Sequence, residues 1–114
     1  MQDELYHFDL YQDAAEATAL YPDKGDNLYY PTLGLAGEAG EVCEKVKKIM
    51  RDQKGYVTEE NTEAISQELG DVLWYVAMVA TELNMSLSAI AEDNMQKLKD
   101  RQERGVLQGS GDKR

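Results

Sequence analysis

The segment 38–46, EAGEVCEKV, recurs 30 positions later as the segment 68–76, ELGDVLWYV. Both copies follow the pattern acid-x-Gly-acid-Val-x-x-x-Val. At about 100° per residue, the two acids of each copy project from one face of a helix, one turn apart. The apolar stripe of each helix borders its acids, so two helices packed through these stripes would bring four carboxylates together. These are the carboxylates of Glu38, Glu41, Glu68 and Asp71.

Four converging carboxylates repel one another unless a cation lies between them. Oxygen ligands suit hard divalent ions, so the repeat predicts a site for Mg²⁺, Mn²⁺ or Ca²⁺, of which Mg²⁺ is favoured, with Mn²⁺ as its substitute. Di-iron helical bundles pair Glu with a Glu-x-x-His motif, and the one histidine, His7, lies outside the repeat, which disfavours iron. The alternative interpretation is a pair of solvated helix faces, which the matched glycines and valines of the two copies disfavour.

Helical periodicity extends outward from the repeat. Apolar residues spaced three and four apart, together with an alanine-rich first segment, predict four helices. These cover about 8–20, 32–50, 58–83 and the chain from 86 onward. Thr58 and Ser86 are suited to cap the last two helices, and strand signals are almost absent. We therefore predict an all-α fold, a four-helix bundle formed by residues 1–104, followed by a flexible tail over 105–114.

The third predicted helix is apolar nearly all round between Leu69 and Leu83. A helix of this kind is buried on most sides, and a monomer would leave an exposed apolar patch. We therefore expect dimerisation to complete the fold, in a homodimer or a homotetramer. Glycines in the two repeats and just before the first are expected where helices approach closely or where a ligand enters. They are Gly34, Gly37, Gly40 and Gly70.

Side chains beside the repeat add candidate ligand contacts. Tyr75 stands next to the acids, where it could contact a base or sugar, or equally be a core tyrosine with a bonded hydroxyl. Trp74 projects elsewhere and is expected in packing or a subunit contact. On the last helix Asn94, within the apolar stripe, forms with Lys97 and Arg101 a polar line suited to a phosphate chain. The alternative for that line is a basic helix end in solvent.

Two lysines on the second predicted helix are further candidates for phosphate binding. Lys45 and Lys48 lie on the acidic side of that helix, in a run of basic residues that is otherwise expected to be solvated surface. Cys43, at the edge of the apolar stripe, is expected to be a small core residue.

Composition excludes several classes of protein. The chain has 114 residues and a formal net charge of −10, which argues against binding nucleic acid through phosphate neutralisation. Its longest apolar run, Val72–Ala80, has nine residues, whereas a membrane span needs about 20. The first residues, 1–4, lack the features of a signal peptide. With a single cysteine and no disulfide, we expect a reducing, cytoplasmic location.

Taken together, the two acidic motifs resemble those of the MazG-like all-α nucleoside triphosphate pyrophosphohydrolases, whose signature is Glu-x-x-Glu and, after a spacer, Glu-x-x-Asp. The resemblance covers about 33–101 and includes the segment 94–101, NMQKLKDR, which resembles the family's fourth helix. It is closest to the short single-domain type of bacteria and phages. Some members carry a further glutamate where this chain has Gly37.

The resemblance implies Mg²⁺-dependent hydrolysis of a nucleoside triphosphate to the monophosphate and diphosphate, in nucleotide-pool sanitation or adjustment. The four acids of the repeats would hold the metal and act in catalysis. Lys97, Arg101, Lys45 and Lys48 would bind phosphate, and Tyr75 and Asn94 would position the sugar or base. Two alternatives stay open: hydrolysis of another phosphoanhydride, such as dUTP, a nucleoside diphosphate or phosphoribosyl-ATP, and a non-catalytic helical oligomerisation module that binds structural cations.

Overall fold

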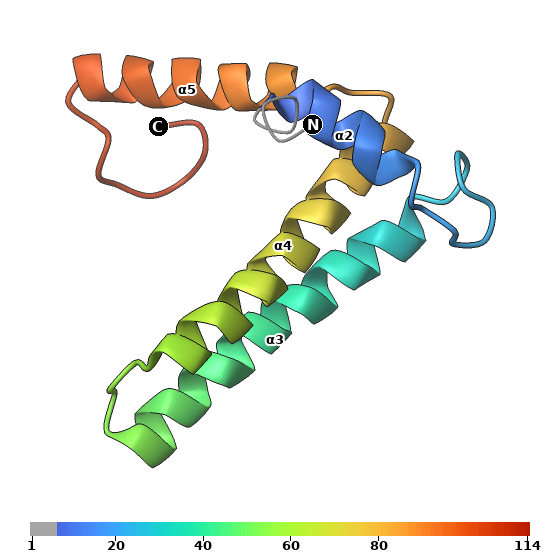
Figure 1. Cartoon of the computed structure of the whole chain (residues 1–114). Helices are drawn as coiled ribbons and strands as arrows, with labels where there is room; N and C mark the ends of the chain where they lie inside the picture. Colours follow the sequence, from blue (N-terminus) through green and yellow to red (C-terminus); the bar gives the residue numbers. More distant parts are fainter. Residues whose placement is uncertain (1–6) are drawn as a thin grey trace.

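The computed structural model describes residues 7–114. The segment 1–6 lies outside the described residues, and so does the expectation that it carries no export signal. Four helices and no strand occur within residues 7–114, which confirms the predicted all-α fold (Figure 1). The helices are α2 (Phe8–Glu16), α3 (Tyr29–Gln53), α4 (Glu59–Glu82) and α5 (Leu87–Glu103).

Helix α3 is longer at both ends than its apolar stripe predicts. It begins at Tyr29, because Pro31 falls in the first turn, where a missing N–H removes no helical hydrogen bond. It ends where Lys54 adopts a left-handed conformation, with φ of 54°. The N–H of Gly55 then donates to the carbonyl of Ile49 over 3.1 Å and satisfies one of the free carbonyls at the helix end.

The two predicted caps are present. The Thr58 hydroxyl accepts from the Asn61 N–H over 3.1 Å, and the Asn61 side chain accepts from the Thr58 N–H over 3.0 Å. Ser86 accepts from the N–H of Ala89 over 3.0 Å at the start of α5. Between α4 and α5, Asn84 is left-handed, with φ of 57°. The chain bends there, so that α5 leaves α4 at 101°.

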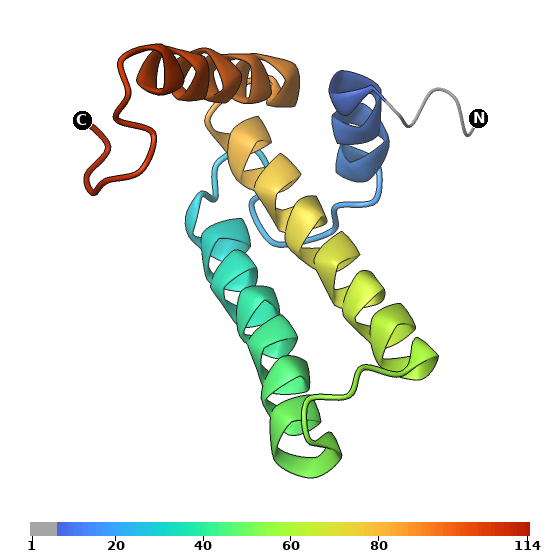
Figure 2. The same cartoon turned by 90° about the vertical axis from the view of Figure 1, so that its left-hand side faces the viewer.

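Helices α3 and α4 form an antiparallel hairpin, and α2 packs on the C-terminal half of α4 and touches α5 (Figure 2). The buried core lies where α2, the end of α4 and the start of α5 meet. Its centre is Met78, which has no exposed surface. The core consists of Ala15, Ala19, Tyr21, Ala77, Met78, Ala80 and Leu87.

One buried polar side chain joins three of the helices. Gln12 of α2 donates through Nε2 to the Thr81 hydroxyl over 3.0 Å and to the Met85 carbonyl over 2.9 Å. Its Oε1 accepts from the N–H of Leu87, over 2.9 Å, at the start of α5. Because this side chain is 8 % exposed and both of its polar atoms are hydrogen-bonded, it fixes where α5 begins relative to α2 and α4.

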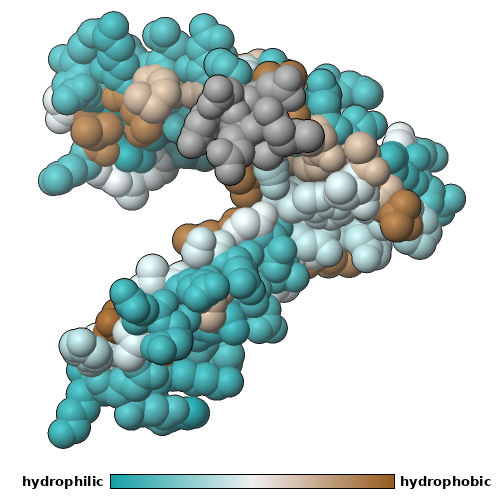
Figure 3. Space-filling model, viewed as in Figure 1, coloured by the Kyte–Doolittle hydropathy of each residue, from teal (hydrophilic) through white to brown (hydrophobic). Residues whose placement is uncertain are grey.

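The single chain is open rather than closed around one core. Its radius of gyration is 16.9 Å, whereas a compact domain of this length has about 13 Å. Between Leu69 and Leu83 the sequence predicts burial on most sides, yet Leu69 is 54 % and Leu73 is 40 % exposed. Figure 3 shows apolar side chains on both sides of the open angle between α5 and the hairpin. On α5, Met95 is 63 % exposed.

No single helix of the described chain is both long and apolar enough to cross a bilayer. Helices α4 and α5 together are long and apolar enough, but the chain bends by 101° between them.

Glu82, near the end of α4, holds the loop between α2 and α3. Its carboxylate accepts from the Tyr21 hydroxyl over 2.6 Å, from the Gly25 N–H over 2.9 Å and from the Asn27 N–H over 2.8 Å. These donors lower the pKa of Glu82, chiefly through the Tyr21 hydrogen bond. The loop in turn places Tyr21 against Tyr30, with ring centroids 4.9 Å apart.

The variant Glu82→Gln is expected to lower the free energy of unfolding at pH 7 by about 1–3 kcal/mol, because an amide cannot accept all three hydrogen bonds. A carboxylate with a lowered folded-state pKa stabilises the protein above its unfolded pKa, near 4.3. That contribution is lost as the pH falls through the lowered folded-state value. Urea titrations should therefore show that the difference in free energy of unfolding between variant and wild type shrinks from pH 7 to pH 3. Glu63→Gln, at an exposed position of α4, is the control. An equal loss of stability in this control would refute the role of Glu82 in holding the loop.

Candidate metal centre

Three of the four predicted acids converge between α3 and α4. Glu38 on α3 and Glu68 and Asp71 on α4 each offer a carboxylate oxygen, and these oxygens lie within 4.8 Å of one another. Glu38 and Glu68 are half-buried, and Asp71 is exposed. The fourth acid, Glu41, points into solvent from the next turn of α3 and is not part of this group.

The cluster carries more negative charge than its surroundings balance. The carboxyl groups of Glu38 and Glu68 share a hydrogen bond, which raises the pKa of Glu38; desolvation and the charge of Asp71 raise it further. Lys45 supplies one counter-charge, with Nζ 3.8 Å from Glu68 Oε1. The raised pKa of Glu38 and the nearby ammonium both reflect the excess negative charge of this cluster.

The donor set fits a hard divalent ion. Oxygen ligands lie about 2.0–2.6 Å from Mg²⁺ or Ca²⁺, so two ligands of one ion are at most about 4–5 Å apart. The carboxylate oxygens of Glu38, Glu68 and Asp71, within 4.8 Å of one another, satisfy that limit. The cluster contains neither His nor Cys, which favours Mg²⁺, Mn²⁺ or Ca²⁺ over softer metals.

Tyr75 lies beside the cluster, and Gly34 makes room for it. A Cβ added to Gly34 would overlap the Tyr75 ring. Burial raises the pKa of Tyr75, and the neighbouring Tyr30 and Glu38 raise it further. Of the four predicted glycines, therefore, Gly34 permits the expected close approach of helices. A Cβ at the others would meet nothing within 4 Å in this chain: Gly37, Gly40 and Gly70.

The variant Gly34→Ala is expected to displace the Tyr75 ring and to destabilise the hairpin by about 1–3 kcal/mol through overpacking. The matched control is Gly40→Ala on the same helix, which should stabilise the chain by up to about 1 kcal/mol, because alanine is the better helix former. Urea unfolding of both variants measures the difference. Equal stability of the two would contradict the packing of Tyr75 against Gly34.

The residues predicted on α5 do not reach the acids within one chain. Asn94 is exposed rather than buried in the apolar stripe, and with Lys97 it lines a separate cavity of about 330 Å³. The physical reason is the bend before α5, which turns this helix away from the hairpin. Cys43, expected in the core, is also exposed, because α3 packs on α4 alone along this stretch.

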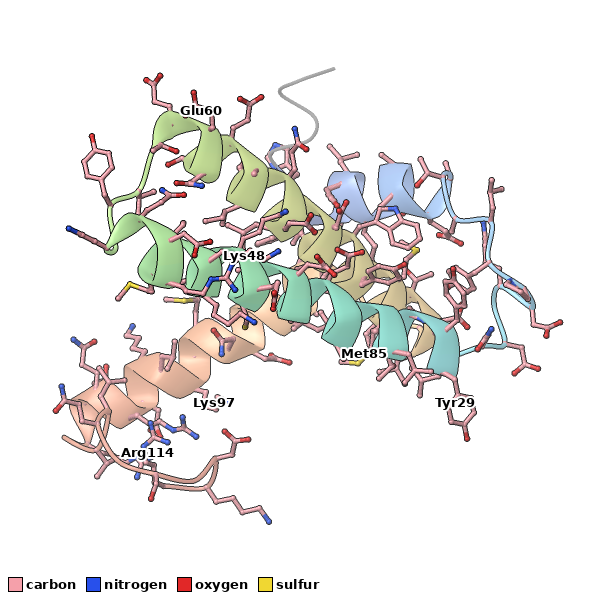
Figure 4. All side chains as sticks on the ribbon, turned by 90° about the horizontal axis from the view of Figure 1, so that it is seen from below. Tyr29, Lys48, Glu60, Met85, Lys97 and Arg114 are labelled. Carbon is pink, nitrogen blue, oxygen red and sulfur yellow. The ribbon has the colours of Figure 1, made fainter. Side chains whose placement is uncertain are left out.

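Asp112 in the tail meets the basic residues of α5. Its carboxylate lies 3.7 Å from Lys97 and 3.9 Å from Arg101. Arg101 also donates to the Asp112 carbonyl and is only 4 % exposed. Figure 4 shows Lys97 and Arg114 on this side of the molecule. Lys48 lies 3.8 Å from Glu44, so of the predicted phosphate-binding residues Lys45 alone is paired with an acid of the cluster.

Two further residues lie beside the acids: Trp74, which was expected in packing or a subunit contact, and Thr18, which the sequence did not single out. Trp74 donates through Nε1 to the Thr18 hydroxyl over 2.8 Å. Both residues line a cavity of about 360 Å³ together with Glu38, Asp71 and Tyr75. Trp74 follows Asp71 by three positions, and an i, i+3 pair shares a helix face; that spacing was the available signal. Thr18 follows α2 and carries no motif.

A helical hairpin that brings Glu38 of the first acidic motif together with Glu68 and Asp71 of the second defines an all-α protein with a candidate metal centre. The sequence matches the MazG nucleotide pyrophosphohydrolase domain over residues 31–106. The chain therefore belongs to the MazG nucleotide pyrophosphohydrolase family.

A curated relative comes from a bacteriophage. The chain is 52 % identical over 113 residues to the Gene 37 protein of Mycobacterium phage L5, with 95 % of this chain and 99 % of the relative covered. No solved structure matches the chain.

Proposed function

We propose that the protein hydrolyses a nucleoside triphosphate, ribo or deoxyribo, to the monophosphate and diphosphate, with Mg²⁺ as cofactor and Mn²⁺ as substitute. The observation that carries the proposal is the convergence of Glu38, Glu68 and Asp71 between two helices of a MazG domain. Nucleotide-pool sanitation or adjustment in the cytoplasm is the cellular role we infer.

Each part of the cluster has a proposed task. Glu38, Glu68 and Asp71 would hold the cation, joined by Glu41 from the next helical turn. A divalent ion held there would supply the positive charge that neutralises phosphate oxygens and makes a water more acidic. Lys45, already 3.8 Å from Glu68, would exchange that carboxylate for a phosphate oxygen when substrate enters.

The proposed active form is a homodimer or a homotetramer. Apolar side chains lie on both sides of the open angle between α5 and the hairpin (Figure 3). Leu69 and Leu73 of α4 and Met95 of α5 are each at least 40 % exposed. A second copy seated in that angle would cover them. It would also bring basic side chains of α5 toward an acidic hairpin, the charge complementarity that orients two surfaces. Asn94, Lys97 and Arg101 would then act on substrate from such an assembly.

Product analysis tests the reaction directly. The protein is incubated with each of the eight common ribo- and deoxyribonucleoside triphosphates, with Mg²⁺ or with chelator, and the products are separated by ion exchange. We expect monophosphate and diphosphate, formed only with metal. A nucleoside diphosphate and inorganic phosphate as products would instead place the protein in another class of hydrolases. Absence of product with all eight nucleotides would contradict the proposal and favour another phosphoanhydride substrate or a binding module.

A further inference from the structure

The tail after α5 turns back on itself and closes into a loop (Figure 1). Gly105 and Gly111 allow its turns, because both are left-handed, with φ of 72° and 87°. The guanidinium of Arg114 donates to three backbone carbonyls over 2.6–3.0 Å, those of Val106, Leu107 and Gly111. One side chain therefore holds the two ends of the tail together.

Two arginines at the end of α5 fasten this loop to the helix. Arg104, the C-cap residue, donates through Nη2 to the Arg114 carbonyl over 2.6 Å. Arg101, three residues earlier, donates to the Asp112 carbonyl and is only 4 % exposed. The folded tail therefore covers a cationic side chain that the sequence predicted as a phosphate ligand.

The folded-back tail is not needed to end α5. The Arg104 N–H donates to the Asp100 carbonyl over 3.0 Å, and the Val106 N–H donates to the Arg101 carbonyl over 2.9 Å. These bonds satisfy carbonyls of the last helical turn before the chain reverses. The remaining segment, 108–114, is QGSGDKR and contains no apolar side chain. Polar contacts alone hold it, so it can open without disturbing a core.

The Asp112 carboxylate lies against two cations of α5. Its Oδ1 is 3.7 Å from Lys97 Nζ and 3.9 Å from Arg101 Nη2. Both separations exceed those of a hydrogen bond. The Asp112 side chain is also 89 % exposed, against 5 % for Arg101, and an ion pair with an exposed partner is weak. The carboxylate thus occupies the position of an anion on two cations without binding either of them tightly.

We propose that the tail is an autoinhibitory strap, whose Asp112 carboxylate holds Lys97 and Arg101 until a phosphate group displaces it. The proposal rests on the proposed function, which assigns these two side chains to the substrate phosphates. Phosphate oxygens carry more charge than one carboxylate and bond arginine through a planar pair of hydrogen bonds. Only chains with an open strap bind phosphate at these residues, so the apparent affinity falls with the fraction of open chains.

Calorimetric titration with inorganic diphosphate measures this affinity without turnover. The whole protein is used in chelator, so that no metal bridges the probe to the acids of the hairpin. Asp112→Asn should bind diphosphate about fivefold more tightly than the wild type, because a charged competitor is removed. A chain that ends at Leu107 keeps the bonds that end α5 and should bind about tenfold more tightly. Affinity that rises in neither form, or no measurable binding to the shortened chain, would overturn the proposal.

Two further variants separate the strap from a general effect of charge. Arg114→Ala opens the loop but removes a positive charge, so electrostatics alone would weaken diphosphate binding. The strap instead predicts binding that is about threefold tighter. Glu103→Gln is the control, because it removes one negative charge, as Asp112→Asn does, at an exposed position on another face of α5 from Lys97 and Arg101. Weaker binding by Arg114→Ala, or an equal gain in the control, would refute the strap.

NMR spectroscopy shows whether diphosphate displaces the tail. The backbone amide signals of Gly109 and Gly111 report on the loop, and that of Gly25, in the loop between α2 and α3, is the reference. When diphosphate is added to the whole protein, the two tail signals should move to the positions of a disordered chain while the Gly25 signal stays. Tail signals that do not move although diphosphate binds would contradict displacement.

The outcomes distinguish this proposal from the proposed function. Tighter diphosphate binding by Asp112→Asn and by the shortened chain, without turnover of any triphosphate, would refute the hydrolase and support the strap. Turnover with the same KM in the wild type and the shortened chain would refute the strap and support the hydrolase. With both proposals correct, the KM of the shortened chain falls by about the same factor as its dissociation constant for diphosphate.

Discussion

Replacing Glu68 by glutamine is expected to lower kcat/KM by about 10³-fold while the fold stays intact. The amide keeps the shape of the side chain but removes the charge that would hold a cation beside Glu38 and Asp71. A metal ion contributes several kcal/mol of charge stabilisation in the transition state, and each 1.36 kcal/mol is about tenfold in rate. Steady-state kinetics with the preferred nucleotide measures the loss.

Thermal unfolding gives a second readout of the same variant. In chelator, Glu68→Gln should unfold at the same temperature as the wild type or higher, because it relieves repulsion among the clustered acids. Added Mg²⁺ should stabilise the wild type, since a ligand that binds only the folded state raises its stability, and should have little effect on the variant. The control is Glu63→Gln on the same helix, exposed and outside the cluster. Normal hydrolysis by Glu68→Gln would disprove the metal-centre assignment.

The second large effect concerns assembly. The double variant Leu73→Gln, Met95→Gln is expected to convert the oligomer into monomers. Both side chains are exposed in the single chain, at 40 % and 63 %, so the substitutions lower the stability of the isolated fold only slightly. Full burial of such a side chain contributes about 1.5–3 kcal/mol, and only about half of each remains to be buried in the interface. A dimer contains two copies of each residue, so the dissociation constant should rise by about 10²-fold to 10⁴-fold.

Sedimentation equilibrium over a range of protein concentrations measures this change. Leu20→Gln is the control, because Leu20 is 93 % exposed in the loop after α2, away from the open angle. We expect kcat/KM to fall together with the dimer fraction if α5 acts across the assembly. A wild-type protein that is monomeric at high concentration, or a double variant that assembles normally, would contradict the proposed interface.

Local patterns in the sequence predicted much of the fold and the centre of the site. The helices and the two N-caps, Thr58 and Ser86, follow from spacing and capping rules that act within one turn. The same rules placed Glu68 and Asp71 on one face of α4 and Glu38 on the facing helix. The role of Glu41 stays a prediction, because this residue lies one turn further along α3, exposed and outside the group of three acids.

Contacts between distant segments were decided by tertiary structure. Thr18 meets Trp74 across 56 positions, because Glu82 and Gln12 tie α2 and its loop to the end of α4. The left-handed Asn84 turns α5 away from the hairpin, which separates Asn94 from the acids despite its place in the predicted stripe. Periodicity gives the face of a helix but not the direction in which the chain leaves it. That direction depends on one backbone conformation in a short connection and on the side chains that hold it.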